Sequence, residues 1–170
     1  MADNGAPFDL SAMPEGLDAL GRRLRAEADG KALRRELAKN LRDELKPAAA
    51  LAKSGIMAMP SAGTMPTSPG LRGEIAKKIR PEVKLGGRWS GARVKARKTR
   101  GTRGFANAPK RTQSAKGWRR RVFGSSTWVT QRGRTLWFDR ALQGGRERQY
   151  QQAVLAAMEA MARRIAGRGR

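Results

Sequence analysis

Hydrophobic residues in the N-terminal third of the chain recur with helical spacing. Leucines three and four residues apart over positions 17–24 predict a first helix that reaches about Ala28. After Gly30, leucines recur at every fourth position from Leu33 to Leu45 and predict a second helix. Pro47 is expected to kink or stop this helix, because proline cannot donate the backbone hydrogen bond. Residues 48–58 would then resume it as a further segment.

The pattern changes after residue 58. Residues 59–70 hold three prolines and two glycines, which predicts a loop, and residues 71–79 form a short apolar helix that ends before Pro81. Residues 83–85 and 92–96 have the composition of short strands separated by glycines.

Two further strands are expected near the C-terminus, at residues 122–123 and 127–130, with a turn at 124–126. Beyond the glycine pair at 144–145, apolar residues at 154, 158, 161 and 165 mark one face of a last helix.

These elements predict an α+β fold, with long N-terminal helices and a C-terminal amphipathic helix packed on a small antiparallel sheet. Residues 1–15 show no periodicity and are expected to be a flexible arm. Residues 16–170 would form a single α+β domain, with mobile loops at about 59–70 and 97–117.

The large apolar residues are few. Leu, Ile, Val and Phe together number 27 of 170 residues, about 16%, and Ala alone also numbers 27. A fraction of Leu, Ile, Val and Phe below roughly 20%, combined with high net charge, is typical of chains that bury too little apolar surface to form a stable core. The sequence therefore predicts a thin, alanine-rich core that needs partners for full order.

Charge is large and unevenly spread. Lys and Arg number 37 against 14 Asp and Glu, a net charge of +23. Residues 1–30 carry a net −3, residues 91–120 carry eleven bases and no acid, and no carboxylate lies between Glu82 and Asp139. Such polarity fits head-to-tail contact between copies as readily as nucleic-acid binding.

The residue types for common catalysis are missing. The chain has no His and no Cys, so the usual general base, metal ligand and thiolate are absent. Asp43 and Glu44 sit among bases on a predicted helix, and Asp139 is expected to pair with a neighbouring arginine. Residues 101–104 resemble a glycine-rich phosphate loop only loosely. No enzyme, cofactor or metal site is therefore expected.

No membrane segment is expected. The longest apolar run, Ala48–Ala52, is far shorter than the roughly 20 residues needed to cross a bilayer. The N-terminus lacks the basic start and apolar stretch of a secretory signal.

Cationic residues concentrate in the middle of the chain. Alternation along the strand at 92–96 places Arg93, Lys95 and Arg97 on one face, where they would meet phosphates or the carboxylates of an acidic partner, and both readings stay open. The residues expected to make this contact are Arg93, Lys95, Arg97, Lys98, Arg100, Arg103, Lys110 and Arg111.

Most aromatic residues follow the basic stretch and are not interleaved with it, unlike the rings of many nucleic-acid readers. Core packing is the simpler reading for Phe123 and Trp128. Trp137 and Phe138 are adjacent rings near an expected loop, a composition enriched at protein interfaces. The residues expected at a subunit interface are Trp118, Phe123, Trp128, Trp137 and Phe138.

The order of these pieces resembles a known family. A long Leu/Ala helix over 33–58 is followed by the segment 71–75, basic strands, and then Val122–Phe123–Gly124, Trp128–Val129–Thr130–Gln131 and Trp137–Phe138, before the final helix. This order is similar to that of the tail-completion, or head-to-tail joining, proteins of long-tailed bacteriophages.

The resemblance implies a small α+β subunit of a ring in the virion neck, made in the cytoplasm of the bacterial host. The ring is usually six-fold and lies between head-connector and tail-tube proteins, with double-stranded DNA passing through its lumen. The alternative is a free basic nucleic-acid-binding protein that coats DNA or associates with the ribosome.

Overall fold

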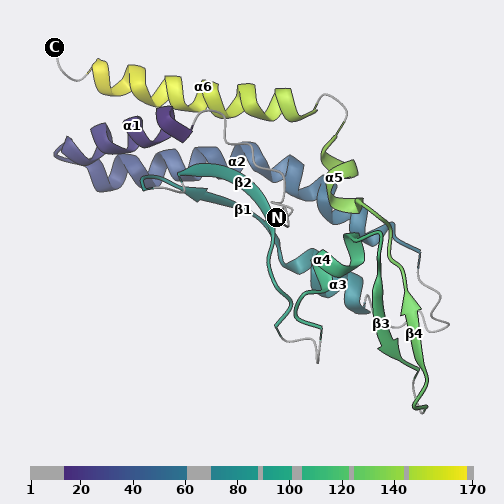
Figure 1. Cartoon of the computed structure of the whole chain (residues 1–170). Coiled ribbons are helices and arrows are strands. Elements are labelled where there is room, and N and C mark those ends of the chain that lie inside the picture. The colour runs from purple at the N-terminus through teal and green to yellow at the C-terminus, as the bar shows by residue number, and fades with distance from the viewer. Residues whose placement is uncertain are drawn as a thin grey trace. The chain divides into compact units, whose positions relative to one another are not determined.

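The structure is a computed structural model that describes residues 14–60, 70–87, 90–100, 105–122, 125–143 and 146–167. In these ranges the chain forms six helices and two small antiparallel sheets of two strands each (Figure 1), which confirms the α+β class. The elements are α1 (Pro14–Ala26), α2 (Gly30–Met57), α3 (Gly70–Lys77), β1 (Ile79–Lys84), β2 (Gly91–Ala96), α4 (Ala108–Gln113), β3 (Trp118–Arg121), β4 (Trp128–Gln131), α5 (Trp137–Leu142) and α6 (Arg146–Ala166).

The chain divides into two compact units. Unit 1 comprises Met1–Ala49, Pro81–Lys95 and Gln143–Arg170, and unit 2 comprises Ala50–Arg80 and Ala96–Leu142. Helix α2 and both strands of the first sheet contribute residues to each unit, so neither unit is one continuous stretch of sequence.

The core of unit 1 is the seam between α1, the first part of α2, and α6, which runs alongside them in Figure 1. The predicted leucine stripes of α1 and α2 are buried, and α6 contributes the apolar face that its spacing predicted. The buried side chains are Leu17, Leu20, Leu24, Leu33, Leu37, Leu41, Leu45, Tyr150, Val154, Met158 and Met161.

The turn between β1 and β2 is fastened to the helices of unit 1. Arg34 donates from Nη2 to the Leu85 carbonyl over 2.8 Å, and the Gly87 amide donates to Asp18 Oδ1 over 3.1 Å. Gly86 has φ +99°, and a Cβ there would lie 2.0 Å from Nη2 of Arg25. The positive φ therefore disfavours a side chain at Gly86, and the exposed end of the Arg25 side chain would have to move to admit one.

Helix α2 runs through Pro47, so of the two outcomes expected there, a kink or a stop, the stop is wrong. Pro47 lies on the exposed face of the helix, whereas Leu45 and Ala48 on either side of it are buried. Burial on both sides of the proline holds the helix together, and water can reach the carbonyl that loses its partner. Tertiary packing thus overrides the local cost of proline.

The core of unit 2 is built where α4 meets α5. Thr112 is fully buried and its hydroxyl donates to the Ala108 carbonyl over 2.8 Å, while the indole Nε1 of Trp137 donates to that hydroxyl over 3.2 Å. Phe138 packs edge-on against Trp137 with ring centroids 5.5 Å apart. The two rings are each only 2% exposed and form the largest apolar mass of this unit.

A second polar link joins the same two helices. Gln113 donates from Nε2 to Asp139 Oδ2 over 2.9 Å and accepts from the Phe138 amide over 3.1 Å. Burial raises the pKa of Asp139 from its ordinary value of 3.8, and the hydrogen bond from Gln113 acts in the opposite direction.

Three local expectations need correction. Helix α4 lies inside the stretch 97–117 that was expected to be a mobile loop. Strand β3 begins at Trp118, four residues earlier than the strand expected at 122–123. Residues 14 and 15 belong to α1 and not to the expected arm, and the rest of the arm, together with positions 61–69 of the expected loop at 59–70, falls outside the described residues.

The leucine stripe of α2 is expected to dominate the stability of unit 1. Leu41→Ala removes a fully buried side chain and is expected to lower the free energy of unfolding by about 2–5 kcal/mol. The exposed Arg35→Ala in the same helix is the control and is expected to change it by less than about 0.5 kcal/mol. Urea denaturation followed by circular dichroism measures both values. Equal effects would contradict the assigned core.

Asp139 is expected to make stability fall as pH rises. A raised pKa means that the folded state holds the proton more tightly, so the free energy of unfolding decreases as pH rises from about 3.8 through the folded pKa. Asp139→Asn cannot titrate and retains an oxygen that accepts from Gln113, so the variant should equal or exceed the parent in stability at pH 7. Denaturation at pH 3.5, 5 and 7 tests this, with Glu159→Gln as an exposed control. A variant that loses stability most at pH 7 would refute the assignment.

Candidate functional site

Unit 2 carries most of the net positive charge of the chain. It holds 18 of the 37 Lys and Arg residues but only two carboxylates, so that +16 of the net +23 resides there. Those two carboxylates are already engaged, since Glu74 forms an ion pair with Lys77 at 2.8 Å and Asp139 accepts from Gln113. The cations of unit 2 therefore find little counter-charge within their own unit.

Several carboxylates of unit 1 pair with bases of the same unit. Asp18 pairs with Arg22 at 2.6 Å, Asp43 with Lys46 at 2.7 Å, and Glu36 with Arg164. These pairs are largely exposed and contribute little to stability.

The most exposed element of unit 2 is the hairpin formed by β3 and β4, here called the hairpin. The register pairs Trp118 with Gln131 and Arg121 with Trp128, so one face carries Arg119, Arg121, Trp128 and Thr130. The opposite face carries Trp118, Arg120, Val129 and Gln131. No residue of either strand is fully buried, so both faces of the hairpin meet solvent over most of their length.

Trp128 holds two arginines on the first of these faces. The guanidinium carbon of Arg119 lies 5.6 Å from the centre of the Trp128 ring, and that of Arg121 lies 5.9 Å from it. Both distances are within the range of cation–π attraction. The side chain of Trp128 is still 53% exposed, so the three side chains form an open surface cluster.

The base of the hairpin is fixed to the rest of unit 2. The ring of Trp118 packs on Phe105 with centroids 5.3 Å apart, and Arg111 of α4 lies 5.5 Å from the centre of the Phe105 ring. Gly117 has φ +68°, and a Cβ there would lie 2.2 Å from the Gln131 carbonyl oxygen. The strands therefore start from a defined position, with no room for a side chain at this glycine.

The end of the hairpin is rich in hydroxyl groups. The Thr127 amide donates to Ser125 Oγ over 3.0 Å, and the Val122 amide donates to the Thr127 carbonyl over 3.0 Å, which extends the ladder past the strands. Phe123, one of the residues expected at an interface, lies outside the described residues.

The structure does not bring the predicted cationic residues together as one row. Val94 is buried while Arg93 and Lys95 face the other side of β2, as the alternation predicted. However, Lys95 lies 3.8 Å from Glu82, and the Nε of Arg93 is buried with no hydrogen-bond partner in the part of the chain described. This face of β2 is thus partly neutralised and partly covered.

The other predicted cations belong to unit 2. Arg97, Lys98 and Arg100 are exposed on the segment after β2, and Lys110 and Arg111 are exposed on α4. Arg103 lies outside the described residues.

The aromatic residues divide between core and surface. Trp137 and Phe138 are buried within unit 2, so these side chains are core residues and are not available to a neighbouring subunit in this structure. Of the five residues expected at an interface, only Trp118 and Trp128 are described with exposed or half-buried side chains.

Sequence reasoning did not assign Arg119 and Arg121 to a site. The sequence feature that identifies them is the run Trp-Arg-Arg-Arg, in which alternate residues share a face of the strand. Only a strand placed at 118–121 puts Arg119 and Arg121 on the same face as Trp128. Because the strand was expected at residues 122–123, Arg119 and Arg121 were not expected to be part of the β-sheet.

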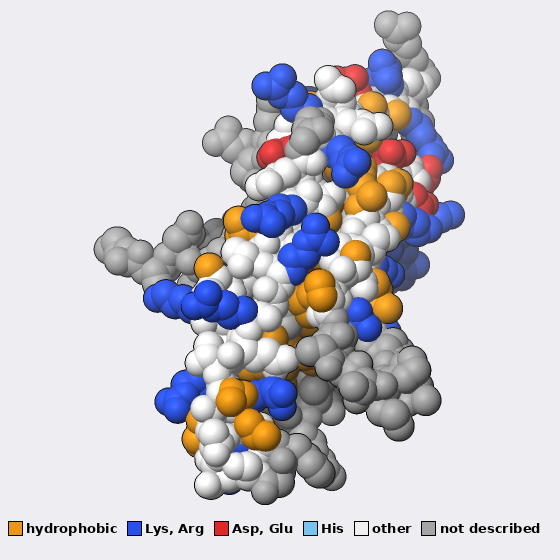
Figure 2. All heavy atoms as spheres, turned by 90° about the vertical axis from the view of Figure 1, so that its right-hand side faces the viewer, with side chains coloured by type: hydrophobic (Ala, Val, Ile, Leu, Met, Phe, Trp, Pro, Cys, Tyr) orange, Lys and Arg blue, Asp and Glu red, His pale blue; other side chains and the backbone are white. Residues whose placement is uncertain are grey.

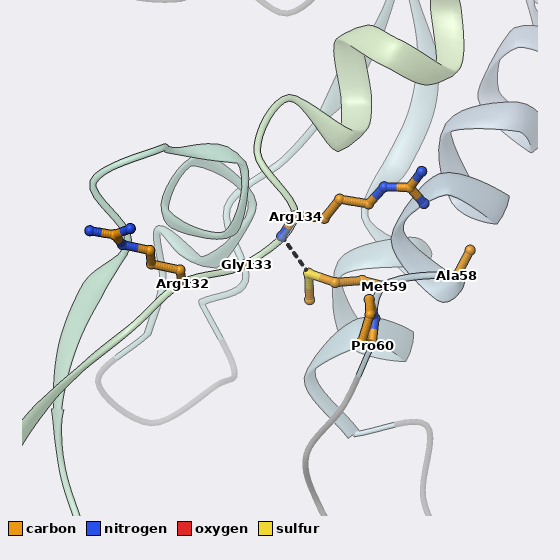
Figure 3. Close-up of a pocket in the computed structure, with 6 residues that line it drawn as sticks. All are labelled: Ala58, Met59, Pro60, Arg132, Gly133 and Arg134. Carbon is orange, nitrogen blue, oxygen red and sulfur yellow. Dashed lines mark hydrogen bonds between the residues drawn. The ribbon is translucent and has the colours of Figure 1, made fainter.

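A pocket of about 360 Å³ lies at the C-terminal end of α2, lined by Ala58, Met59, Pro60, Arg132, Gly133 and Arg134 (Figure 3). The Arg134 amide donates to the thioether sulfur of Met59 over 3.3 Å. Figure 3 shows the side chains of Arg132 and Arg134 extending away from each other, so no charged groups converge in the pocket. The pocket does not have the features of a ligand site.

Within the ranges described, no cluster of acidic residues is arranged to hold a metal ion. The helices of these same ranges also include none that is long and apolar enough to cross a bilayer.

The close approach at Gly117 is expected to be essential for the hairpin. Gly117→Ala imposes both a strained φ and an overlap with backbone, and should lower the free energy of unfolding by about 2 kcal/mol or more. Gly87→Ala is the control, because φ is +86° there but no atom lies within 4 Å, so only conformational strain of about 1 kcal/mol is expected. Urea denaturation compares the two, and a Gly117 variant as stable as the Gly87 variant would show that the hairpin base is not fixed.

Comparisons of this chain with protein-family models, with curated proteins and with solved structures find no match.

Proposed function

We propose that this protein is a structural subunit of a ring at the head–tail junction of a long-tailed bacteriophage. The subunit is made in the bacterial cytoplasm and assembles as a homo-oligomer, six-fold by its resemblance to tail-completion proteins. Its neighbours would be head-connector and tail-tube proteins, and double-stranded DNA would pass through the lumen. The order of motifs supports the proposal, and two of the motifs, Trp128–Gln131 and Trp137–Phe138, lie on β4 and at the start of α5.

The unequal charge of the two units is the observation that carries the proposal. Twelve of the 14 carboxylates lie in unit 1, whereas unit 2 has a net charge of +16. Contacts between unlike surfaces of identical subunits close into rings when the rotation between them allows it. Unit 1 holds 19 Lys and Arg beside its twelve carboxylates, a net charge of +7, so its carboxylates are the groups that a head-to-tail contact would bring to the cations of unit 2. Such a contact suits this chain better than a contact between two copies of unit 2.

The small core also favours an assembled state. A hairpin with four-residue strands is marginal in water unless further surface covers it. Neighbouring proteins in a particle would supply that surface, and binding only the folded form stabilises it.

A free basic nucleic-acid-binding protein is the second candidate, and the arginine cluster around Trp128 favours it. The two candidates differ in where the protein resides and in how many copies each particle holds. A neck ring stays in the particle, and its number of copies equals the order of its rotational symmetry. A DNA-coating protein has no such fixed location or number of copies.

Virions of the phage that encodes this chain test the proposal directly. We expect quantitative mass spectrometry to find about six copies per virion, and electron microscopy to place them between head and tail. Deleting the gene should leave separate heads and tails, and complementation with the wild-type chain should restore joined particles. Joined, infectious virions without this chain at the neck would refute the proposal.

A further inference from the structure

We propose that the hairpin binds the sugar–phosphate backbone of duplex DNA, with Arg119 and Arg121 contacting phosphates and Trp128 positioning them. This inference deepens the proposed function, because it names what the most exposed element of unit 2 touches. It rests on contacts within the hairpin and is tested on the isolated protein.

A two-stranded hairpin has the form that fits a groove of DNA. The major groove of B-form DNA is about 12 Å wide and admits a two-stranded antiparallel ribbon. Arg119 and Arg121 lie on one face of this ribbon and Arg120 lies on the other. A ribbon that turns the first face toward the DNA would therefore bring Arg119 and Arg121 to the duplex together, while Arg120 faces away from it.

The Trp128 cluster organises the arginines for this contact. Residues two apart on a strand are about 6.6 Å apart, so Arg119 and Arg121 stand side by side along β3. Attraction to the Trp128 ring restrains the guanidinium groups of Arg119 and Arg121 beside a side chain that is 53% exposed, where their N–H groups can meet a ligand from solvent. Each guanidinium group can then donate two hydrogen bonds to one phosphate, at a lower entropic cost than a mobile side chain would incur.

Nothing in the hairpin repels a phosphate. No carboxylate occurs between Glu82 and Asp139, a span that includes both strands and their connection. The lower end of Figure 2, where the hairpin lies, accordingly shows blue and orange side chains and no red ones. At the turn the Ser125 hydroxyl donates to Thr127 Oγ1 over 2.9 Å, and the Thr127 hydroxyl is a donor of the kind that contacts DNA backbones.

A protein partner fits this element less well. Stable protein interfaces bury about 800 Å² on each side around an apolar centre. Among the described residues of the hairpin and its connection, the exposed large apolar side chains are Val122, Trp128 and Val129, and Trp128 is engaged by two charged groups. A contact between the hairpins of two copies is disfavoured, because the strands of each carry arginines and no carboxylate.

The salt dependence of DNA binding tests the proposal. A 30-base-pair duplex is titrated with the full-length protein at several NaCl concentrations, for the parent and for the double variant Arg119→Gln/Arg121→Gln. Each phosphate contact contributes about 0.9 to the slope of log affinity against log salt, so loss of two contacts should reduce the slope by about 2. We expect affinity at 100 mM NaCl to fall by about tenfold or more.

The matched control is Arg148→Gln/Arg163→Gln, which removes the same charge from exposed positions of α6. We expect this control to change the slope by less than 0.5 and the affinity by less than threefold. If both double variants weaken binding equally, attraction by overall charge is sufficient and the proposal is wrong.

The role of Trp128 has its own readout. Trp128→Leu keeps both arginines and an apolar side chain but removes the ring, so affinity should fall about threefold or more. Trp128→Phe restores a ring and should recover most of the loss. Equal affinities for Leu and Phe variants that melt at the parental temperature would refute the positioning role.

A parallel titration with poly-L-glutamate addresses the acidic-protein alternative. If the hairpin variants retain parental affinity for DNA but lose affinity for this polyanion, the hairpin docks on an acidic protein and the DNA proposal fails. Failure here leaves the copy number and the position of the protein in virions untouched, so the two proposals fail separately.

Discussion

Unit 2 holds 18 Lys and Arg but only two carboxylates, so its cations repel one another. Anions from outside the unit are needed to offset this repulsion. The two carboxylates of this unit are committed to Lys77 and Gln113, so rearranging side chains cannot relieve the repulsion. Burial is also limited, since its core depends on the Trp137–Phe138 pair and a few aliphatic residues. Charge and core size therefore point the same way, toward a protein that functions in contact with anions and neighbours.

The sequence predicted those parts of the fold that depend on local periodicity. The leucine stripe over residues 33–45 is buried as expected, and so is the apolar face of α6. In an amphipathic helix the apolar residues lie on one face, so the sequence alone determines which face is buried. Strand β2 also alternates as predicted. The proline in α2 was misjudged because buried neighbours on both sides of it hold the helix, and such packing is not visible locally.

The candidate site depended more on tertiary contacts. Helix α4 has no apolar repeat and is defined by the buried hydroxyl of Thr112, which binds its own helix and the indole of Trp137. The hydrogen bond to Thr112 places Trp137 in the core. From the sequence, Trp137 and Phe138 were expected at a protein interface, because they are adjacent rings near glycines. The arginine cluster was missed for a related reason, because the strand register decides which of three consecutive arginines share a face with Trp128.

The charged side chains on the two strands of the hairpin are all arginines. The chain contains no histidine to add or remove charge near neutrality, and the two strands of the hairpin contain no carboxylate. The electrostatic character of the hairpin is therefore constant, so acidification cannot act as its switch. Any timing of its contacts has to come from the order in which partners appear and from the local concentration of competing ions.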